Sequence, residues 1–148
     1  MKYFTSEWWA TEQDDFEDLF KKYDDYFASI KSKLPNSLVE LYELHTLHDS
    51  RVISIHSDFD KQKVILDLLG WDIALNEPVL YNLIFSNVSS FSQQLPKKRD
   101  AWKEMGDLGY WECEWLTKEI EIRMLFASGA EFKIVFVDFS FNHEKGQA

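Results

Sequence analysis

Residues 45–56, His-Thr-Leu-His-Asp-Ser-Arg-Val-Ile-Ser-Ile-His, separate two parts of the chain with different apolar spacing. Before this stretch apolar residues recur every three or four positions, as on one face of a helix. After it they recur at every second position, as on one face of a strand. Helices followed by a run of strands are typical of an α+β protein. The sequence therefore predicts a helical part at 1–47, strands over 48–142 and a frayed polar tail at 143–148.

The helical part contains two predicted helices, one long and one short. Thr5 or Ser6 is a suitable N-cap for the long helix. The sequence leaves open whether this helix is interrupted near residues 11–14. Its apolar side consists of Phe16, Leu19, Phe20, Tyr23, Phe27, Ile30 and Leu34. Because the residue before a proline is disfavoured in the helical conformation, we expect Pro35 to end this helix. The short helix is then expected over residues 36–47.

About six mostly antiparallel strands are expected after residue 50, in one curved sheet or a small sandwich. They are predicted at 51–57, 63–69, 79–88, 110–116, 120–126 and 132–139. Residues 89–108 are expected to form a polar connection or a short helix. The long helix is expected to cover a sheet face that consists of Ile53, Ile55, Leu66, Leu83, Trp111 and Ile122.

The length of 148 residues is typical of a single domain, 1–148. One cysteine, Cys113, excludes an internal disulfide and any CxxC zinc or redox site. Its position between Trp111 and Trp115 predicts a buried, inert thiol. The first residues lack the features of a signal peptide, and no apolar stretch approaches the roughly 20 residues that span a bilayer. We therefore expect a cytoplasmic protein without membrane contact.

The formal net charge of −10 restricts the choice of partner. Attraction to a phosphate backbone requires excess positive charge, so nucleic acid is not expected as a ligand. The basic run Lys97–Arg99 next to Trp102 does not outweigh that balance. A basic protein is the partner that this charge favours kinetically, although plain solubility also explains the acidity.

His45, His48 and Asp49 are the first candidate site. If the short helix continues through them, the two histidines lie on one face, and imidazole and carboxylate groups are ligands for zinc and other divalent ions. The structural alternative has His48 packing at a sheet edge and Asp49 capping the turn into the first strand. Because two histidines without a fixed third ligand are common, we predict no cofactor and no metal here.

The second candidate site is an acidic ridge across neighbouring strands, expected to face solvent. Its members are Glu112, Glu114, Glu119, Glu121 and Glu131, with Asp138 nearby. Paired carboxylates can act as general acid and base when a pocket gives them opposed environments. No GxGxxG, GxxxxGK, HExxH or GxSxG motif accompanies them. The ridge is therefore interpreted as a docking surface for a basic partner.

Several short motifs resemble those of a family of small uncharacterised bacterial proteins, a domain of unknown function. They are the start Met1-Lys2-Tyr3-Phe4-Thr5-Ser6-Glu7-Trp8-Trp9, the Leu34-Pro35 break, Leu47-His48-Asp49-Ser50-Arg51-Val52-Ile53, and Leu125-Phe126-Ala127-Ser128-Gly129-Ala130-Glu131-Phe132. The resemblance covers most of the chain and implies no catalytic residues. In size and architecture the chain is also similar to small proteins that neutralise bacterial toxins. This similarity is an analogy of architecture alone.

These observations favour a non-enzymatic protein-binding module of the immunity or regulatory type, which uses an acidic surface to bind a basic protein. The alternative is a small metal-binding protein or hydrolase-like enzyme that uses His45, His48 and Asp49. The sequence leaves open whether the protein is a monomer or a homodimer.

Overall fold

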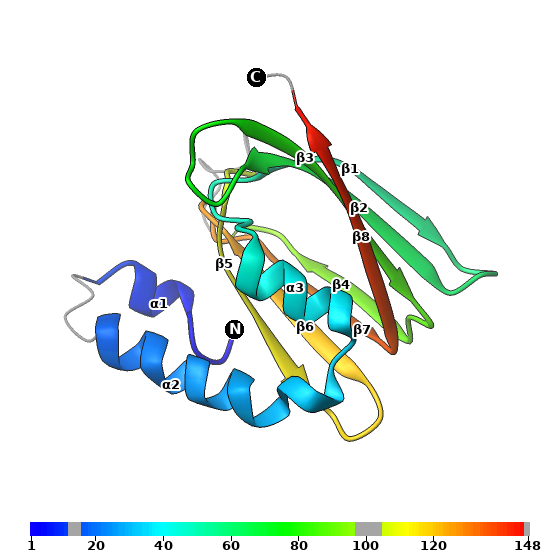
Figure 1. Ribbon diagram of the computed structural model, residues 1–148, viewed down its shortest axis with the longest axis horizontal. Coiled ribbons are helices and arrows are strands. Elements are labelled where there is room, and N and C mark those ends of the chain that lie inside the picture. The colour runs from blue at the N-terminus through cyan, green and yellow to red at the C-terminus, as the bar shows by residue number, and fades with distance from the viewer. Residues whose placement is uncertain (12–15, 97–104, 147–148) are drawn as a thin grey trace.

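The fold is taken from a computed structural model that describes residues 1–11, 16–96 and 105–146 (Figure 1). Its helices are α1 (Ser6–Trp9), α2 (Phe16–Ile30), the 3-10 helix η1 (Lys31–Lys33) and α3 (Asn36–Leu44). The predicted N-cap is present, because Thr5 Oγ1 accepts a hydrogen bond from Trp8 N at 3.1 Å. None of the helices in these ranges is long and apolar enough to cross a membrane.

The long helix predicted between residue 7 and residue 34 is not one continuous α-helix, which agrees with the alternative that left a break open. The chain forms the short helix α1 and, separately, the 15-residue helix α2. The predicted break at residues 11–14 falls largely on positions outside the described residues. Leu34 is extended, with φ −91° and ψ 151°, so the helical path does end before Pro35 as expected. The second helix ends at Leu44, three residues earlier than predicted.

In the described part of the chain, eight strands form two four-stranded antiparallel sheets. One sheet has the order β1-β2-β3-β8, and the other has the order β4-β7-β6-β5. Their bounds are β1 (Arg51–Asp58), β2 (Lys63–Trp71), β3 (Pro78–Ser86), β4 (Ser90–Gln94), β5 (Leu108–Trp115), β6 (Ile120–Phe126), β7 (Glu131–Phe136) and β8 (Asp138–Lys145). The α+β class is therefore confirmed, with two sheets and more strands than predicted.

The two additional strands come from segments for which a different structure was predicted. Ser90–Gln94, predicted as a connection, is strand β4 and pairs with β7. The predicted strand 132–139 is divided at Val137 into β7 and β8, which belong to different sheets. Residues 143–145, predicted as a frayed tail, pair with β3 as the end of β8. The basic run Lys97–Arg99 and Trp102 lie outside the described residues.

Aromatic side chains join the inner faces of the two sheets. The ring of Phe85, in β3, lies 5.0 Å from that of Phe136, in β7 of the other sheet, measured between centroids. Helix α3 lies between the sheets (Figure 1), and its Leu38 and Leu41 are fully buried. Because this burial removes large apolar areas from water, the region forms the centre of the hydrophobic core.

The predicted helix-covered sheet face is only partly correct. Leu66, Leu83 and Ile122 are buried, although they belong to two different sheets. Ile53 and Ile55 are 50% and 36% exposed, so their predicted burial is wrong. The reason is that β1 is an edge strand, in a hairpin whose tip extends away from the helices (Figure 1).

Helix α2 covers the outer edge of the second sheet instead. The hydroxyl oxygen of Tyr23 accepts a hydrogen bond from Cys113 N at 2.7 Å, and that of Tyr26 accepts one from Trp115 N at 3.0 Å. These two bonds satisfy amides of the edge strand β5 that another strand could otherwise pair with. Cys113 is fully buried, and burial raises the pKa of its thiol. The prediction of a buried thiol is thus confirmed, and the raised pKa disfavours the reactive thiolate form.

Candidate functional site

The segment from His45 to Arg51 leads from α3 into β1 and also ties the two sheets together. Asp49 N donates a hydrogen bond to Leu108 O, and Leu108 N donates one to Ser50 O, both at 2.8 Å. The predicted turn is present, since Ser50 N donates to Leu47 O at 3.2 Å. Asp49 has φ 62°, a left-handed conformation that Asp tolerates better than most residues.

His45 turns toward an aromatic group on the inner face of the first sheet. Its ring lies 4.7 Å from the ring of His143, 5.2 Å from Phe141 and 5.8 Å from Tyr81. Partial burial, followed by the neighbouring His143, lowers the pKa of His45. The side chain therefore packs as a neutral aromatic ring, because protonation would place a charge in a partly buried site beside a second imidazole.

His48 lies apart from this group, and the predicted common face does not form because α3 ends at Leu44. His48 Nδ1 is 2.9 Å from the Asp49 carboxylate, and both side chains are about half exposed. The expected capping bond from Asp49 to the turn is replaced by this contact. Within residues 1–11, 16–96 and 105–146, no group of three His, Cys, Asp or Glu residues could hold a metal ion.

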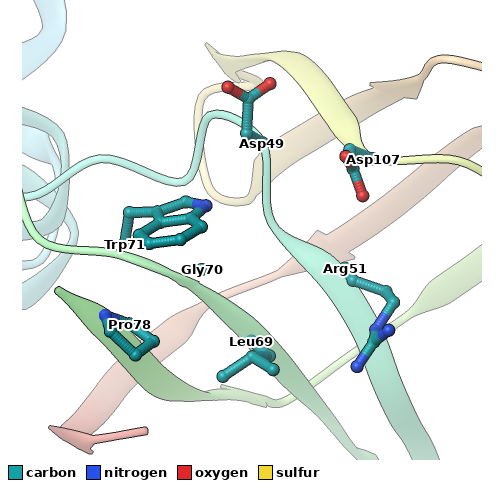
Figure 2. A pocket seen from close by; sticks show the side chains of 7 residues that line it. All are labelled: Asp49, Arg51, Leu69, Gly70, Trp71, Pro78 and Asp107. Carbon is teal, nitrogen blue, oxygen red and sulfur yellow. The ribbon is translucent and has the colours of Figure 1, made fainter. Parts of the chain in front are cut away.

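Asp49 does line a cleft at the junction of the two sheets (Figure 2). The cleft has a volume of about 550 Å³. Its lining residues are Asp49, Arg51, Leu69, Gly70, Trp71, Pro78 and Asp107. The pairing of Ser50 with Leu108 brings the elements that carry Asp49 and Asp107 together. Trp71 and Pro78 are opposite each other across β2 and β3 and provide the apolar wall.

The cleft combines three kinds of recognition groups. Asp49 and Asp107 are exposed carboxylates, and Arg51 is an exposed guanidinium at the start of β1. Trp71 provides a partly exposed indole on the side of the cleft away from Asp107 and Arg51 (Figure 2). Asp49 was predicted as a candidate residue from the sequence, whereas Arg51, Trp71 and Asp107 were not. No local pattern marks them, because they become neighbours only through the pairing of distant strands.

Glu112 is not part of a solvent-facing ridge, because its side chain is fully buried. Its carboxylate accepts hydrogen bonds from the backbone amides of Lys2, Tyr3 at 2.9 Å and Phe4 at 3.2 Å. Arg123 Nε donates to the same carboxylate at 2.9 Å. The first residues of the chain therefore cover this face of the sheet, which the alternation within β5 could not indicate.

Arg123 gathers two further carboxylates of the predicted ridge. Its Nη1 lies 2.8 Å from Glu114 Oε2 and 2.7 Å from Glu121 Oε2. Hydrogen bonds from Lys2, at 3.0 Å, and from Arg123 lower the pKa of Glu114. We call Glu112, Glu114, Glu121 and Arg123 the Arg123 cluster. Because its carboxylates are already paired, it attracts an external cation less strongly than free carboxylates would.

The other two glutamates of the ridge also have partners within the protein. Glu131 forms an ion pair with the amino group of Met1 at 2.8 Å. Glu119 accepts a hydrogen bond from the hydroxyl of Ser89. The cleft, in contrast, has two exposed carboxylates, Asp49 and Asp107, in the same lining as the aromatic side chain of Trp71.

The fold, two antiparallel sheets joined by a crossing segment and covered by helices, defines a mixed α+β protein with a cleft at the sheet junction. By sequence the chain belongs to the family described as Protein of unknown function (DUF4085), whose model matches residues 1–138. This confirms the resemblance to a domain of unknown function. A search of curated proteins finds no match. The family match ends at the first residue of β8.

Proposed function

We propose that the protein is a non-enzymatic binding module of the immunity or regulatory type, which holds a basic partner protein in the cleft. The observation that carries this proposal is that two exposed carboxylates, Asp49 and Asp107, line the same cleft as the indole of Trp71. The formal net charge of −10 adds a long-range attraction that accelerates association with a basic protein.

The cleft is suited to a lysine or arginine side chain of the partner. Its charged group would pair with Asp49 and Asp107, while its aliphatic part would lie against Trp71 and Pro78. A cation over an indole gains roughly 0.5–1 kcal/mol at an exposed site. Arg51 can donate to a carbonyl or carboxylate of the partner, which would fix the orientation of the bound segment. Tryptophan and arginine are also enriched among residues that dominate binding energy at interfaces.

A peptide of eight lysines serves as a defined probe for this site. We expect the double variant D49N/D107N to bind it about two- to thirtyfold more weakly than the wild type, because each of the two exposed ion pairs contributes roughly 0.2–1 kcal/mol. The matched control is E17Q/E144Q, which removes the same charge from exposed positions on α2 and β8. Isothermal titration calorimetry at low ionic strength measures both affinities, and circular dichroism checks that the variants are folded.

The two double variants distinguish site-specific binding from general attraction to an acidic protein. Equal weakening in D49N/D107N and E17Q/E144Q would show that only net charge matters and would reject the cleft. If the cleft variant alone loses affinity, it becomes the negative control for cross-linking the natural partner in host cells. Binding should also weaken as salt rises, because exposed charges are screened over about 10 Å at 0.1 M ionic strength.

A further inference from the structure

Strand β1 is an edge strand with an exposed apolar surface. In the order of its sheet it pairs with β2 on one side, and among the described strands none lies on its other side. Six of its eight residues are exposed. They include Ile53, 50% exposed, and Ile55, 36% exposed, while Phe59 in the adjoining turn is 92% exposed. An exposed edge of this kind is a template for pairing with another strand.

By contrast, the edge strands β5 and β8 are covered by contacts with other parts of the protein. Tyr23 and Tyr26 occupy backbone amides of β5, as described above. Helix α3 lies beside β8, where Ser37 Oγ donates to Phe139 O at 2.6 Å. β1 has neither of these covers and contains no lysine or proline, so its edge is modified only by a bulge between Val52 and Ser54 and by the charges of Arg51 and Asp58 at its ends.

The register between β1 and β2 defines which residues of β1 share a face. Ile55 is opposite the buried Leu66, so it belongs to the inner face. A β-bulge at Ile53 shifts the alternation, so that Arg51 and Asp58 both belong to the outer face. These two residues stand at opposite ends of the strand and carry opposite charges.

We propose that β1 pairs antiparallel with β1 of a second copy of this chain, with the two-fold axis at Ile55. In that register Ile55 faces Ile55 of the second copy. Arg51 faces Asp58 of the second copy, and the symmetry produces this ion pair twice. A shift of the axis by one ladder position to Ser54 or His56 removes both charge pairs. Charge complementarity therefore selects this register. In it, the β1-β2-β3-β8 sheets of the two copies join into one continuous sheet.

The pairing uses main-chain hydrogen bonds for affinity and side chains for register, as in other cases of strand addition. Val52 then faces Ser57 of the second copy, and Ser54 faces His56 of the second copy. The contact is confined to one edge, so we expect a dissociation constant in the micromolar range, typical of small interfaces. This inference shares Arg51 with the cleft, so Asp58, which does not line the cleft, is the residue that separates the two proposals by experiment.

Charge reversal tests the proposed register directly. Analytical ultracentrifugation of the wild type between about 5 and about 500 µM should show a reversible monomer–dimer equilibrium. R51D and D58R each place like charges opposite each other twice, so each should weaken dimerisation at least tenfold. The double variant R51D/D58R restores opposite charges and should recover most of the wild-type association. The matched controls K22D and E17R reverse exposed charges on α2 and should dimerise as the wild type does.

Three outcomes would overturn the proposal. They are a wild type that remains monomeric throughout the concentration range, single reversals without effect, and a double variant as weak as the single ones. Circular dichroism of every variant excludes unfolding as the cause of a lost dimer. Titration of D58R with the eight-lysine peptide separates the two proposals, because Asp58 does not line the cleft. If D58R binds the peptide like the wild type but no longer dimerises, the result supports both the cleft and the β1 dimer. Either proposal can fail without the other.

Discussion

The substitution Glu112→Gln should be among the most destabilising single changes in this protein. The Glu112 carboxylate accepts four hydrogen bonds, from the amides of Lys2, Tyr3 and Phe4 and from Arg123 Nε. An amide has one accepting oxygen and presents an NH₂ group to donors, so about two of these four donors lose their acceptor. At about 1–3 kcal/mol for each buried unpaired donor, the expected loss is about 2–6 kcal/mol. Removing one partner of a buried ion pair costs a similar 3–5 kcal/mol.

Urea denaturation of the wild type and E112Q measures this loss as a difference in the free energy of unfolding. The matched control is E114Q, which removes a charge from the same Arg123 cluster at a side chain that is 22% exposed. We expect E114Q to cost no more than about 1 kcal/mol, because it breaks more solvated pairs. Hydrogen exchange at residues 2–4 should accelerate strongly in E112Q alone. Equal costs for the two variants would refute the reasoning that burial and backbone amides give Glu112 its importance.

Three further predictions follow from buried contacts. Because the pKa of His45 is lowered in the folded protein, the unfolded chain binds a proton at this residue first as the pH falls below about 6.5. The free energy of unfolding, measured by urea denaturation, should therefore decrease from pH 7.5 to pH 5.5. This decrease should be smaller in H45Q. A Cβ on Gly70 would lie 2.1 Å from Ser50 Oγ, so G70A should lower the stability measured by thermal denaturation by about 1–3 kcal/mol. Adding S50A to G70A should recover at least half of this loss. If the effects of the two substitutions on stability simply add, the clash is not the cause. Y23F leaves the buried Cys113 amide without its acceptor and should lower unfolding free energy by about 1–3 kcal/mol, whereas an unchanged midpoint in urea would exclude that role.

Strands with a strong apolar alternation could be predicted from sequence because the two-residue period is a property of the extended backbone. Ile120–Phe126 is an example whose bounds agree with β6. Ser90–Gln94 has mostly polar, exposed side chains, so its strand exists through pairing with β7 and leaves no apolar signal. The alternation of residues 132–139 correctly indicated extended chain but did not reveal that Val137 marks a change of sheet.

The candidate site shows a similar division between local and distant information. Asp49 was identified because turn chemistry is local, whereas Asp107 joins it only through the pairing of Ser50 with Leu108. Glu112 was correctly placed on the polar face of its strand. Its burial depends on residues 2–4, and nothing in the sequence around Glu112 specifies which segment covers that face.

The pairing of β3 with β8 has a consequence for how the protein folds. β3 has its second neighbour only after residues 138–145 have been synthesised, and the Arg123 cluster holds residues 2–4 against a strand from the second half of the chain. Contacts between such distant segments carry a large loop-closure cost and slow folding. During synthesis the hairpin β1–β2 can form early, while β3 presents an open edge until the last strand arrives. We therefore expect the nascent chain to be most prone to misassembly just before β8 emerges.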